Sequence, residues 1–328
     1  TILLAAAIGF LLAAGAAYLL DYLDDTLKNP DDVQKTVELT TLGAVPRMEG
    51  VGPGNELAVA TEGQSAGKEA FRVLRTNLQF AAVDRPLHTL MVTSPAPNEG
   101  KSMTVANLAG AMAQAGRRTV LIDCDLHKPR LHRLFGLRNN VGVTTALLEE
   151  HPVLDGLLQD TAIPGLQVLT SGPLPPNPAE LLGSTRMREF LAELLTQFDL
   201  VLLDSPPTAA LSDAAILSTQ CDGVLLVLDA GKSRREVARR AMEALRRVNA
   251  RVVGAVLNRM PMQGDSYYYY YYYTYDYAGY NMDGQSGPGQ NGSGKGDEKN
   301  ARRGFLRGRR SADQPNTTGV APLPPTRS

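Results

Sequence analysis

The sequence predicts an α/β domain of three layers, in which a mainly parallel sheet is covered by helices on both faces. Six short apolar runs indicate strands, and helical stretches alternate with most of them. Near-continuous apolar strands are typical of strands buried on both sides, and right-handed crossovers place helices on both faces. The expected strands are residues 88–94, 118–123, 166–170, 199–204, 223–228 and 251–257, and the main expected helices are 68–80, 102–115, 179–196, 209–219 and 232–248.

Composition sets broad limits on the function. The chain of 328 residues has a net charge of −1, so its overall charge does not indicate a nucleic-acid partner. Cys124 and Cys221 are too few for a disulfide framework and suit a reducing compartment. The four histidines lack metal-ligand spacing, so we expect them at ordinary surface or loop positions.

The chain begins with an uncharged apolar run at residues 2–20. As a helix rising about 1.5 Å per residue, this run would cross the roughly 30 Å of a bilayer core. A signal-peptide core is usually shorter and follows basic residues, which the sequence lacks here. We therefore expect one transmembrane helix, and a buried helix of a soluble domain is the alternative. Because the first residue is Thr1, we also expect a fragment or a processed product.

Polar and glycine-rich stretches divide the rest of the chain. A helix-start signal at Asn29-Pro30-Asp31 follows the apolar run, and a Gly-rich linker comes after it. The tail has few apolar residues and carries eight Lys and Arg against four Asp and Glu from Asn281 onward, so we expect it to be disordered and mildly basic. The expected parts are a transmembrane helix (1–20), a juxtamembrane segment and linker (21–66), the main domain (67–262), a tyrosine cluster (263–280) and the disordered tail (281–328).

The strongest chemical signal is SPAPNEGKS, Ser94 to Ser102, between an expected strand and an expected helix. A loop at such a junction directs backbone N–H groups at an anion, and the helix N-terminus adds to the attraction. Lys101 would reach the β- and γ-phosphates and Ser102 would bind Mg²⁺, although Pro95 stands where the standard pattern has its first glycine. The expected nucleotide-binding residues are Ser94, Pro95, Ala96, Pro97, Asn98, Glu99, Gly100, Lys101, Ser102, Met103 and Asn258.

Three aspartates stand at the ends of expected strands, Asp123 and Asp125 after one strand and Asp204 at the end of another. A carboxylate beside a phosphate loop can hold Mg²⁺ or accept a proton from an attacking hydroxyl. Helix capping is the alternative for each one, but three together with Gly-Lys-Ser favour phosphoryl transfer. The expected catalytic residues are Lys101, Asp123, Asp125 and Asp204, and the expected metal ligands are Ser102, Asp125 and Asp204.

ATP with Mg²⁺ is the expected cofactor pair. A guanine site usually shows Asn-Lys-x-Asp after a late strand, whereas the last strand here leads into Leu-Asn-Arg-Met at residues 257–260, without a following carboxylate. Asn258 either contacts the adenine or serves as a simple cap, and the sequence leaves both alternatives open.

These motifs resemble the bacterial tyrosine kinases of exopolysaccharide synthesis, the BY-kinase family, over about residues 15–280. The matching segments are LDDTLKNPDDVQ, EAFRVLRTNLQF, SPAPNEGKS, VLIDCDLHKPRLH, SGPLPPNPAELLGS, DLVLLDSPP and DGVLLVLDAGKSRREVARRA. The resemblance implies a P-loop NTPase-like fold, with the family's Walker A, A′ and B motifs at residues 94–102, 119–125 and 199–204. It also implies that the main domain is a P-loop tyrosine kinase domain.

The resemblance further implies an autokinase that regulates capsular or exopolysaccharide polymerisation and export. Its ring-assembly motif ExxRxxR is matched by Glu69, Arg72 and Arg75, for which an intrahelical ion pair is the alternative. The implied location is the inner (cytoplasmic) membrane with the kinase domain in the cytoplasm, and a further helix and a periplasmic domain would precede Thr1. The implied partners are further copies in a ring-like homo-oligomer, the polysaccharide polymerase and export machinery, and a tyrosine phosphatase, with no nucleic acid. The expected phosphorylation sites are Tyr267, Tyr268, Tyr269, Tyr270, Tyr271, Tyr272, Tyr273, Tyr275, Tyr277 and Tyr280.

The chain departs from the family pattern at two places. The family often has Arg shortly after the A′ aspartates, whereas this chain has His127 and Lys128, which keeps a charge but loses a bidentate phosphate contact. Ala96 stands where related partitioning and division-site ATPases have a lysine, which argues against the dimer-sandwich ATPases.

Two other functions remain as alternatives. One is a membrane-anchored P-loop ATPase scaffold of polysaccharide assembly without protein kinase activity. The other treats the tyrosines as a stacking surface for sugar or nucleic acid, although no Lys or Arg is interleaved among them. The seven consecutive tyrosines from Tyr267 to Tyr273 have no obvious structural use, so they favour the autokinase.

Overall fold

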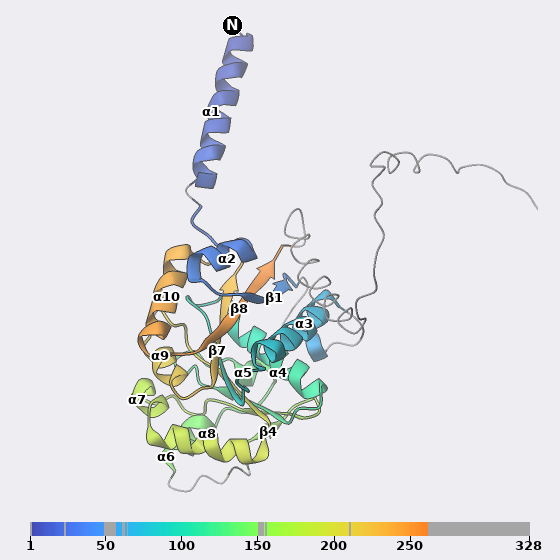
Figure 1. The fold of residues 1–328 in the computed structure, drawn as a ribbon, viewed down its shortest axis with the longest axis vertical. Coiled ribbons are helices and arrows are strands. Elements are labelled where there is room, and N and C mark those ends of the chain that lie inside the picture. The colour runs from blue at the N-terminus through green and yellow to red at the C-terminus, as the bar shows by residue number, and fades with distance from the viewer. Residues whose placement is uncertain are drawn as a thin grey trace, which may run out of the picture. The chain divides into compact units, whose positions relative to one another are not determined.

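The computed structural model describes residues 2–22, 24–48, 57–60, 63, 65–149, 154, 156–209 and 211–261. The predicted tyrosine cluster and basic tail lie outside these ranges. Within them, eight strands form one sheet in the order β1-β8-β7-β2-β6-β3-β5-β4, with every neighbouring pair parallel except β4 and β5 (Figure 1). The strands are β1 Thr41–Pro46, β2 Thr89–Thr93, β3 Thr119–Asp123, β4 Gln159–Asp160, β5 Leu166–Leu169, β6 Leu200–Asp204, β7 Gly223–Asp229 and β8 Val252–Met260.

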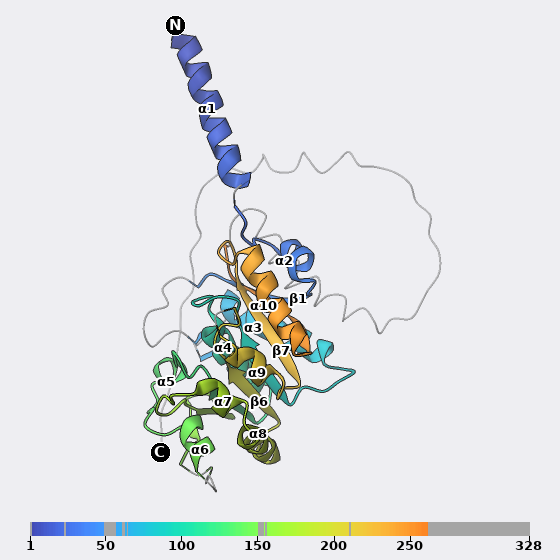
Figure 2. The same ribbon diagram turned by 90° about the vertical axis from the view of Figure 1, so that its left-hand side faces the viewer.

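Helices cover both faces of this sheet (Figures 1 and 2). In β6, Leu200 and Leu202 pack into one apolar core, whereas Val201 and Leu203 pack into the other. The first core includes side chains of α3 and α4, and the second includes side chains of α8 and α9. The helices are α1 Ile2–Tyr22, α2 Pro30–Val37, η1 Ala58–Ala60, α3 Ala66–Ala81, α4 Lys101–Gln114, α5 Leu131–Leu134, α6 Val143–Leu148, α7 Pro178–Leu182, α8 Thr185–Gln197, α9 Asp213–Ser218 and α10 Arg235–Arg247. The predicted three-layer α/β fold with a mainly parallel sheet is confirmed.

The segment before residue 67 contributes to the folded domain, although we predicted it as a juxtamembrane segment and linker. Asn29 caps α2 by accepting a hydrogen bond from the backbone N–H of Asp32 at 2.8 Å, as the helix-start signal indicates. Val33 and Val37 lie four residues apart on α2 and are buried in the main core. Strand β1 then pairs in parallel with β8 at the edge of the sheet. The charged residues of this segment therefore flank an apolar side that the domain buries.

One predicted helix, residues 179–196, forms as two helices. α7 ends at Leu182 and α8 begins at Thr185. Between them, the hydroxyl of Ser184 accepts a hydrogen bond from the N–H of Met187 at 3.2 Å, which caps α8. A Cβ atom on Gly183 would lie 2.8 Å from the side chain of Ile216, so the absence of a side chain at Gly183 lets α7 pack closely on α9. The helix predicted from residue 209 begins later, at Asp213.

The first apolar run forms a helix, α1, as expected. Ile2 and Leu3 are 85% and 88% exposed, which is unusual for such large apolar side chains. Among the residues that the structure describes, no helix reaches the length and apolar character that a membrane crossing requires. The transmembrane helix therefore stays a prediction.

Candidate active site

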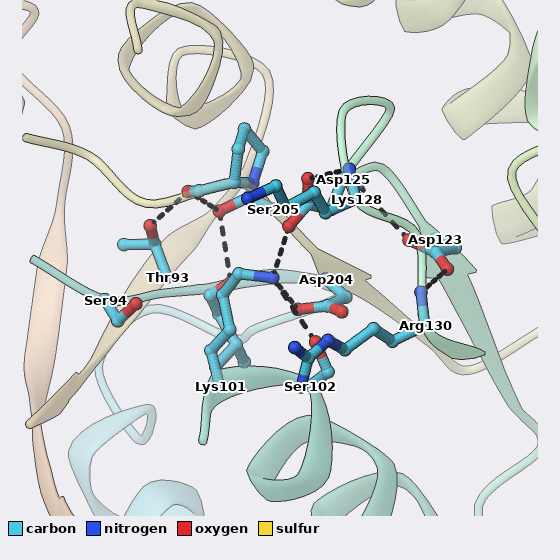
Figure 3. Close-up of polar contacts among 12 residues, drawn as sticks. Thr93, Ser94, Lys101, Ser102, Asp123, Asp125, Lys128, Arg130, Asp204 and Ser205 are labelled. Carbon is cyan, nitrogen blue, oxygen red and sulfur yellow. Dashed lines mark hydrogen bonds and ion pairs between the residues drawn. The ribbon is translucent and has the colours of Figure 1, made fainter. Parts of the chain in front are cut away.

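Three strand ends meet at the centre of the sheet. β2, β6 and β3 are neighbours, and Asp123 pairs with Asp204 where β3 and β6 end. Because parallel strands have their carboxyl ends at one edge, the loop after β2 lies beside both aspartates. The residues that Figure 3 shows gathered there include Lys101, Ser102, Asp123, Asp125 and Asp204. The structure thus brings together every residue that we predicted to be catalytic or metal-binding.

The phosphate loop has its tight turn at Gly100. This residue has a φ of 91°, and a Cβ atom here would lie 2.1 Å from Asn258 Nδ2. The same Asn258 amide donates to the backbone carbonyl of Glu99 at 3.0 Å. Asn258 therefore holds the loop itself, a role that neither of our two interpretations of this residue included.

Lys101 is the cation at the centre of the site. Its Nζ lies 2.7 Å from Asp125 Oδ2, 3.3 Å from Asp204 Oδ1 and 3.3 Å from the hydroxyl of Ser102. Burial opposes the charge of Lys101, but the carboxylates of Asp204 and Asp125 outweigh that effect and keep its pKa above the ordinary value. The lysine therefore stays protonated at neutral pH, as a phosphate-binding group must.

The two A′ aspartates have different tasks. One oxygen of Asp123 accepts hydrogen bonds from the backbone N–H groups of Arg130 at 3.0 Å and Leu131 at 2.9 Å, and the other accepts from Asp125 N at 3.3 Å. Burial, with repulsion from Asp204, raises the pKa of Asp123 to about 7. Asp123 therefore shapes the loop that carries Asp125.

Asp125 has one oxygen on Lys101 and the other on the backbone N–H of Lys128 at 3.0 Å. Burial would favour the neutral acid, but the adjacent Lys101 ammonium holds the pKa of Asp125 below its ordinary value. Asp125 is thus an ionised carboxylate beside the phosphate loop.

Asp204 and Ser102 fit a magnesium site. Asp204 is fully buried, and its Oδ2 atom has no hydrogen-bond partner. Burial raises the pKa of Asp204 because it disfavours the charged carboxylate. A cation at the free oxygen would offset this cost of keeping Asp204 ionised. In the described part of the chain no group of three His, Cys, Asp or Glu residues is arranged to hold a metal ion. Mg²⁺ at phosphoryl-transfer sites usually takes one or two protein ligands and completes its shell with phosphates and water.

Glu99 has a role in the loop that the sequence did not reveal. Its carboxylate accepts hydrogen bonds from the backbone N–H of Ala96 at 2.9 Å and from the hydroxyl of Ser233 at 2.5 Å. Burial raises the pKa of Glu99 to about 7. A carboxyl inside a phosphate-binding loop was the available signal, but its partner Ser233 lies far away in the sequence.

Two arginines that we did not predict hold the tip of the loop at Asn98. Arg259 donates to the backbone carbonyl of Asn98 at 2.8 Å and forms an ion pair with Asp229 at 2.6 Å. Arg130 donates to the side-chain oxygen of Asn98 at 3.1 Å. Asn98 has a φ of 65°, a conformation that asparagine tolerates better than most residues.

The predicted ring-assembly residues lie on α3, outside this site. Glu69 and Arg72 form an intrahelical ion pair at 3.3 Å, and both side chains are partly exposed. Arg75 donates to the backbone carbonyl of Ala111 on α4 at 3.1 Å. The alternative that we considered for Glu69 and Arg72 is therefore present, and a role between subunits stays a prediction.

His127 is exposed in the A′ loop, as expected for the histidines, and it has a specific partner. Its Nε2 atom lies 2.7 Å from a carboxylate oxygen of Asp213, the first residue of α9. This contact joins the A′ loop to α9, which follows β6 in the chain.

Comparison with known proteins agrees with this geometry. The ParA family model described as an NUBPL iron-transfer P-loop NTPase matches residues 87–267. The tyrosine-protein kinase YwqD of Bacillus subtilis (strain 168) is 44% identical over 211 residues, which cover 64% of this chain and 89% of that protein.

Two solved structures have a similar fold. The kinase domain of the Escherichia coli tyrosine kinase ETK is 29% identical with a TM-score of 0.67, covering 73% of this chain and 96% of that one. The chimerical protein CapA2B2 is 35% identical with a TM-score of 0.66, covering 71% of this chain and 100% of that one. The alignment with YwqD covers nearly all of that protein, and the phosphate loop, the A′ aspartates and Asp204 form one site in this chain. The chain therefore belongs to the bacterial tyrosine kinase family of P-loop NTPases.

Proposed function

We propose that this chain is an ATP-dependent protein-tyrosine autokinase. The observation that carries the proposal is the position of Lys101, whose ammonium is shared by Asp125 and Asp204 directly beside the phosphate loop. This arrangement places a cation for phosphates next to carboxylates for a metal ion and a hydroxyl. The kinase relatives support tyrosine as the acceptor.

In the proposed reaction, each residue has a separate task. The free backbone N–H groups of the phosphate loop, which Pro95 and Pro97 lack, and the Lys101 ammonium would bind the phosphates of ATP. Ser102 and Asp204 would hold Mg²⁺, with Asp125 close by, and the ion would neutralise charge on the phosphate oxygens. The bond from the tyrosine oxygen to the γ-phosphorus forms as the bond to the β-phosphate oxygen breaks, and ADP leaves. Free tyrosine has a pKa of about 10, so Asp125 would accept the hydroxyl proton mainly as the transition state develops.

The proposed acceptors are the ten tyrosines between Tyr267 and Tyr280. We propose that they enter the site of a neighbouring subunit in a ring-like homo-oligomer that uses Glu69, Arg72 and Arg75. Each added phosphate contributes about −1.5 to −2 charges at neutral pH. A phosphorylated tyrosine cluster would be repelled by a site that already holds ATP phosphates and carboxylates. Its departure would weaken the ring.

The cellular setting of the proposal is a bacterial inner membrane with the domain on the cytoplasmic side. The exposed apolar side chains of α1 support membrane anchoring. The proposed pathway is capsular or exopolysaccharide polymerisation and export, with the polymerase and export machinery and a tyrosine phosphatase as partners.

Transfer of label from [γ-³²P]ATP to the full chain, in the presence of Mg²⁺, tests the proposal. An autokinase would place alkali-stable label on the protein itself. The ATPase scaffold that we considered as the alternative would release phosphate and leave the protein unlabelled.

A further inference from the structure

Arg130 stands at the border between the A′ loop and the phosphate loop. Its backbone N–H donates to Asp123 at 3.0 Å, and its Nη2 atom donates to the Asn98 side chain at 3.1 Å. One residue therefore spans the two loops that surround Lys101. Figure 3 shows the side chain running from Asp123 toward the start of α4, where Lys101 and Ser102 lie.

The charge of this guanidinium is not neutralised locally. Arg130 is exposed, and among the described residues no carboxylate forms an ion pair with it. Arg259 also contacts Asn98, but its charge is paired with the buried Asp229. The amide oxygen of Asn98 is a neutral acceptor, and a guanidinium binds the paired oxygens of a phosphate more strongly.

The neighbouring basic residues of the A′ loop do not fill the same role. His127 is turned toward Asp213, with 2.7 Å between Nε2 and the carboxylate oxygen. Lys128 is exposed, and its backbone N–H is the group that contacts Asp125. An ammonium in any case lacks the planar pair of donors that a guanidinium offers to a phosphate.

We propose that Arg130 leaves Asn98 and binds the terminal phosphate of ATP, so that this residue distinguishes ATP from ADP. The inference rests on the proposed nucleotide site, but it does not depend on tyrosine being the acceptor. Because Asp123 fixes the backbone of Arg130, only the side chain has to move between the amide and the phosphate.

Binding of Mg-ADP and of Mg-AMP-PNP, a non-hydrolysable ATP analogue, to the full chain tests this inference by calorimetry. Arg130→Gln should weaken AMP-PNP binding about tenfold more than ADP binding, since a charge-assisted contact to a phosphate is lost. Arg130→Lys should restore part of the difference. Arg133→Gln, an exposed change on the adjoining α5, is the matched control and should leave both affinities unchanged.

Asn98→Gly separates the phosphate contact from bracing of the loop. It removes the amide partner at a position of positive φ, and it should preserve the preference for AMP-PNP. Equal weakening of both nucleotides by Arg130→Gln would show that the residue only braces the loop and would overturn the inference. An unchanged AMP-PNP affinity would overturn it as well.

The same measurements separate this inference from the proposed function. A wild-type chain that binds neither nucleotide would overturn both. Selective loss of AMP-PNP binding in a chain that never labels itself would overturn the autokinase and leave the role of Arg130 standing.

Discussion

Lys101 Nζ lies 2.7 Å from Asp125 Oδ2 in a buried site, and among the described residues its other ion-pair partner is Asp204. The ammonium keeps Asp125 ionised, and the carboxylates keep the lysine charged. The cation and the carboxylates therefore depend on one another.

Lys101→Met should abolish autophosphorylation and also lower the stability of the domain. Phosphate binding loses its cation, and breaking a buried ion pair typically costs about 3–5 kcal/mol. Label transfer and urea unfolding measure the two effects. Lys35→Met, an exposed change on α2, is the control and should leave both unchanged. Full autophosphorylation by Lys101→Met would show that the assignment is wrong.

Glu99→Gln should make the domain more stable at alkaline pH. Burial raises the pKa of Glu99 to about 7 from an ordinary value of 4.5, so the folded state favours the neutral acid. The contribution of this group to the free energy of unfolding is therefore complete below pH 4.5 and is lost as the pH rises through about 7. A neutral glutamine avoids this loss, and we expect a gain of about 1–3 kcal/mol at pH 8 that disappears near pH 4.5.

Urea unfolding of the full chain across this pH range measures the difference between Glu99→Gln and the wild type. Glu193→Gln, at an exposed position of α8, serves as the control and should follow the wild-type profile. An identical pH profile for Glu99→Gln and the wild type would contradict the raised pKa.

Charge reversal at Glu69, Arg72 and Arg75 should convert the proposed oligomer to monomers in sedimentation. The intrahelical pair between Glu69 and Arg72 is worth only about 0.3–0.5 kcal/mol, so its loss alone should leave the fold intact. A charge swap, Glu69→Arg with Arg72→Glu, keeps an intrahelical pair but inverts the charges offered to a neighbour. If the swapped chain still forms the wild-type oligomer, these two residues act only within their own helix.

Replacement of the ten tyrosines of the tyrosine cluster by phenylalanine should give an oligomer that persists in the presence of Mg-ATP. Without acceptor hydroxyls the tyrosine cluster cannot gain phosphate charge, so no repulsion would drive it from the active site of the neighbouring subunit. Light scattering before and after ATP addition follows the assembly. If the chain with these ten substitutions still cycles between ring and monomer, assembly does not depend on phosphorylation of these tyrosines.

The sequence predicted the parts of the site that are local in the chain. The Gly-Lys-Ser motif and the strand-end aspartates can each be recognised from a short sequence pattern. A parallel sheet brings the carboxyl ends of its strands to one edge, so these residues must lie close together. The strand β1 was missed because its stability comes from pairing with β8, more than two hundred residues later. The contacts of Glu99 with Ser233 and of Arg130 with Asn98 join separate loops in the same way. Contacts of this kind depend on how the chain folds back, which residue spacing does not encode.

Mass spectrometry of the full chain after incubation with Mg-ATP tests the autokinase most directly. We expect phosphate on tyrosines between Tyr267 and Tyr280 in the wild type and none in Lys101→Met. Hydrolysis of ATP that leaves every one of these tyrosines unmodified would contradict it.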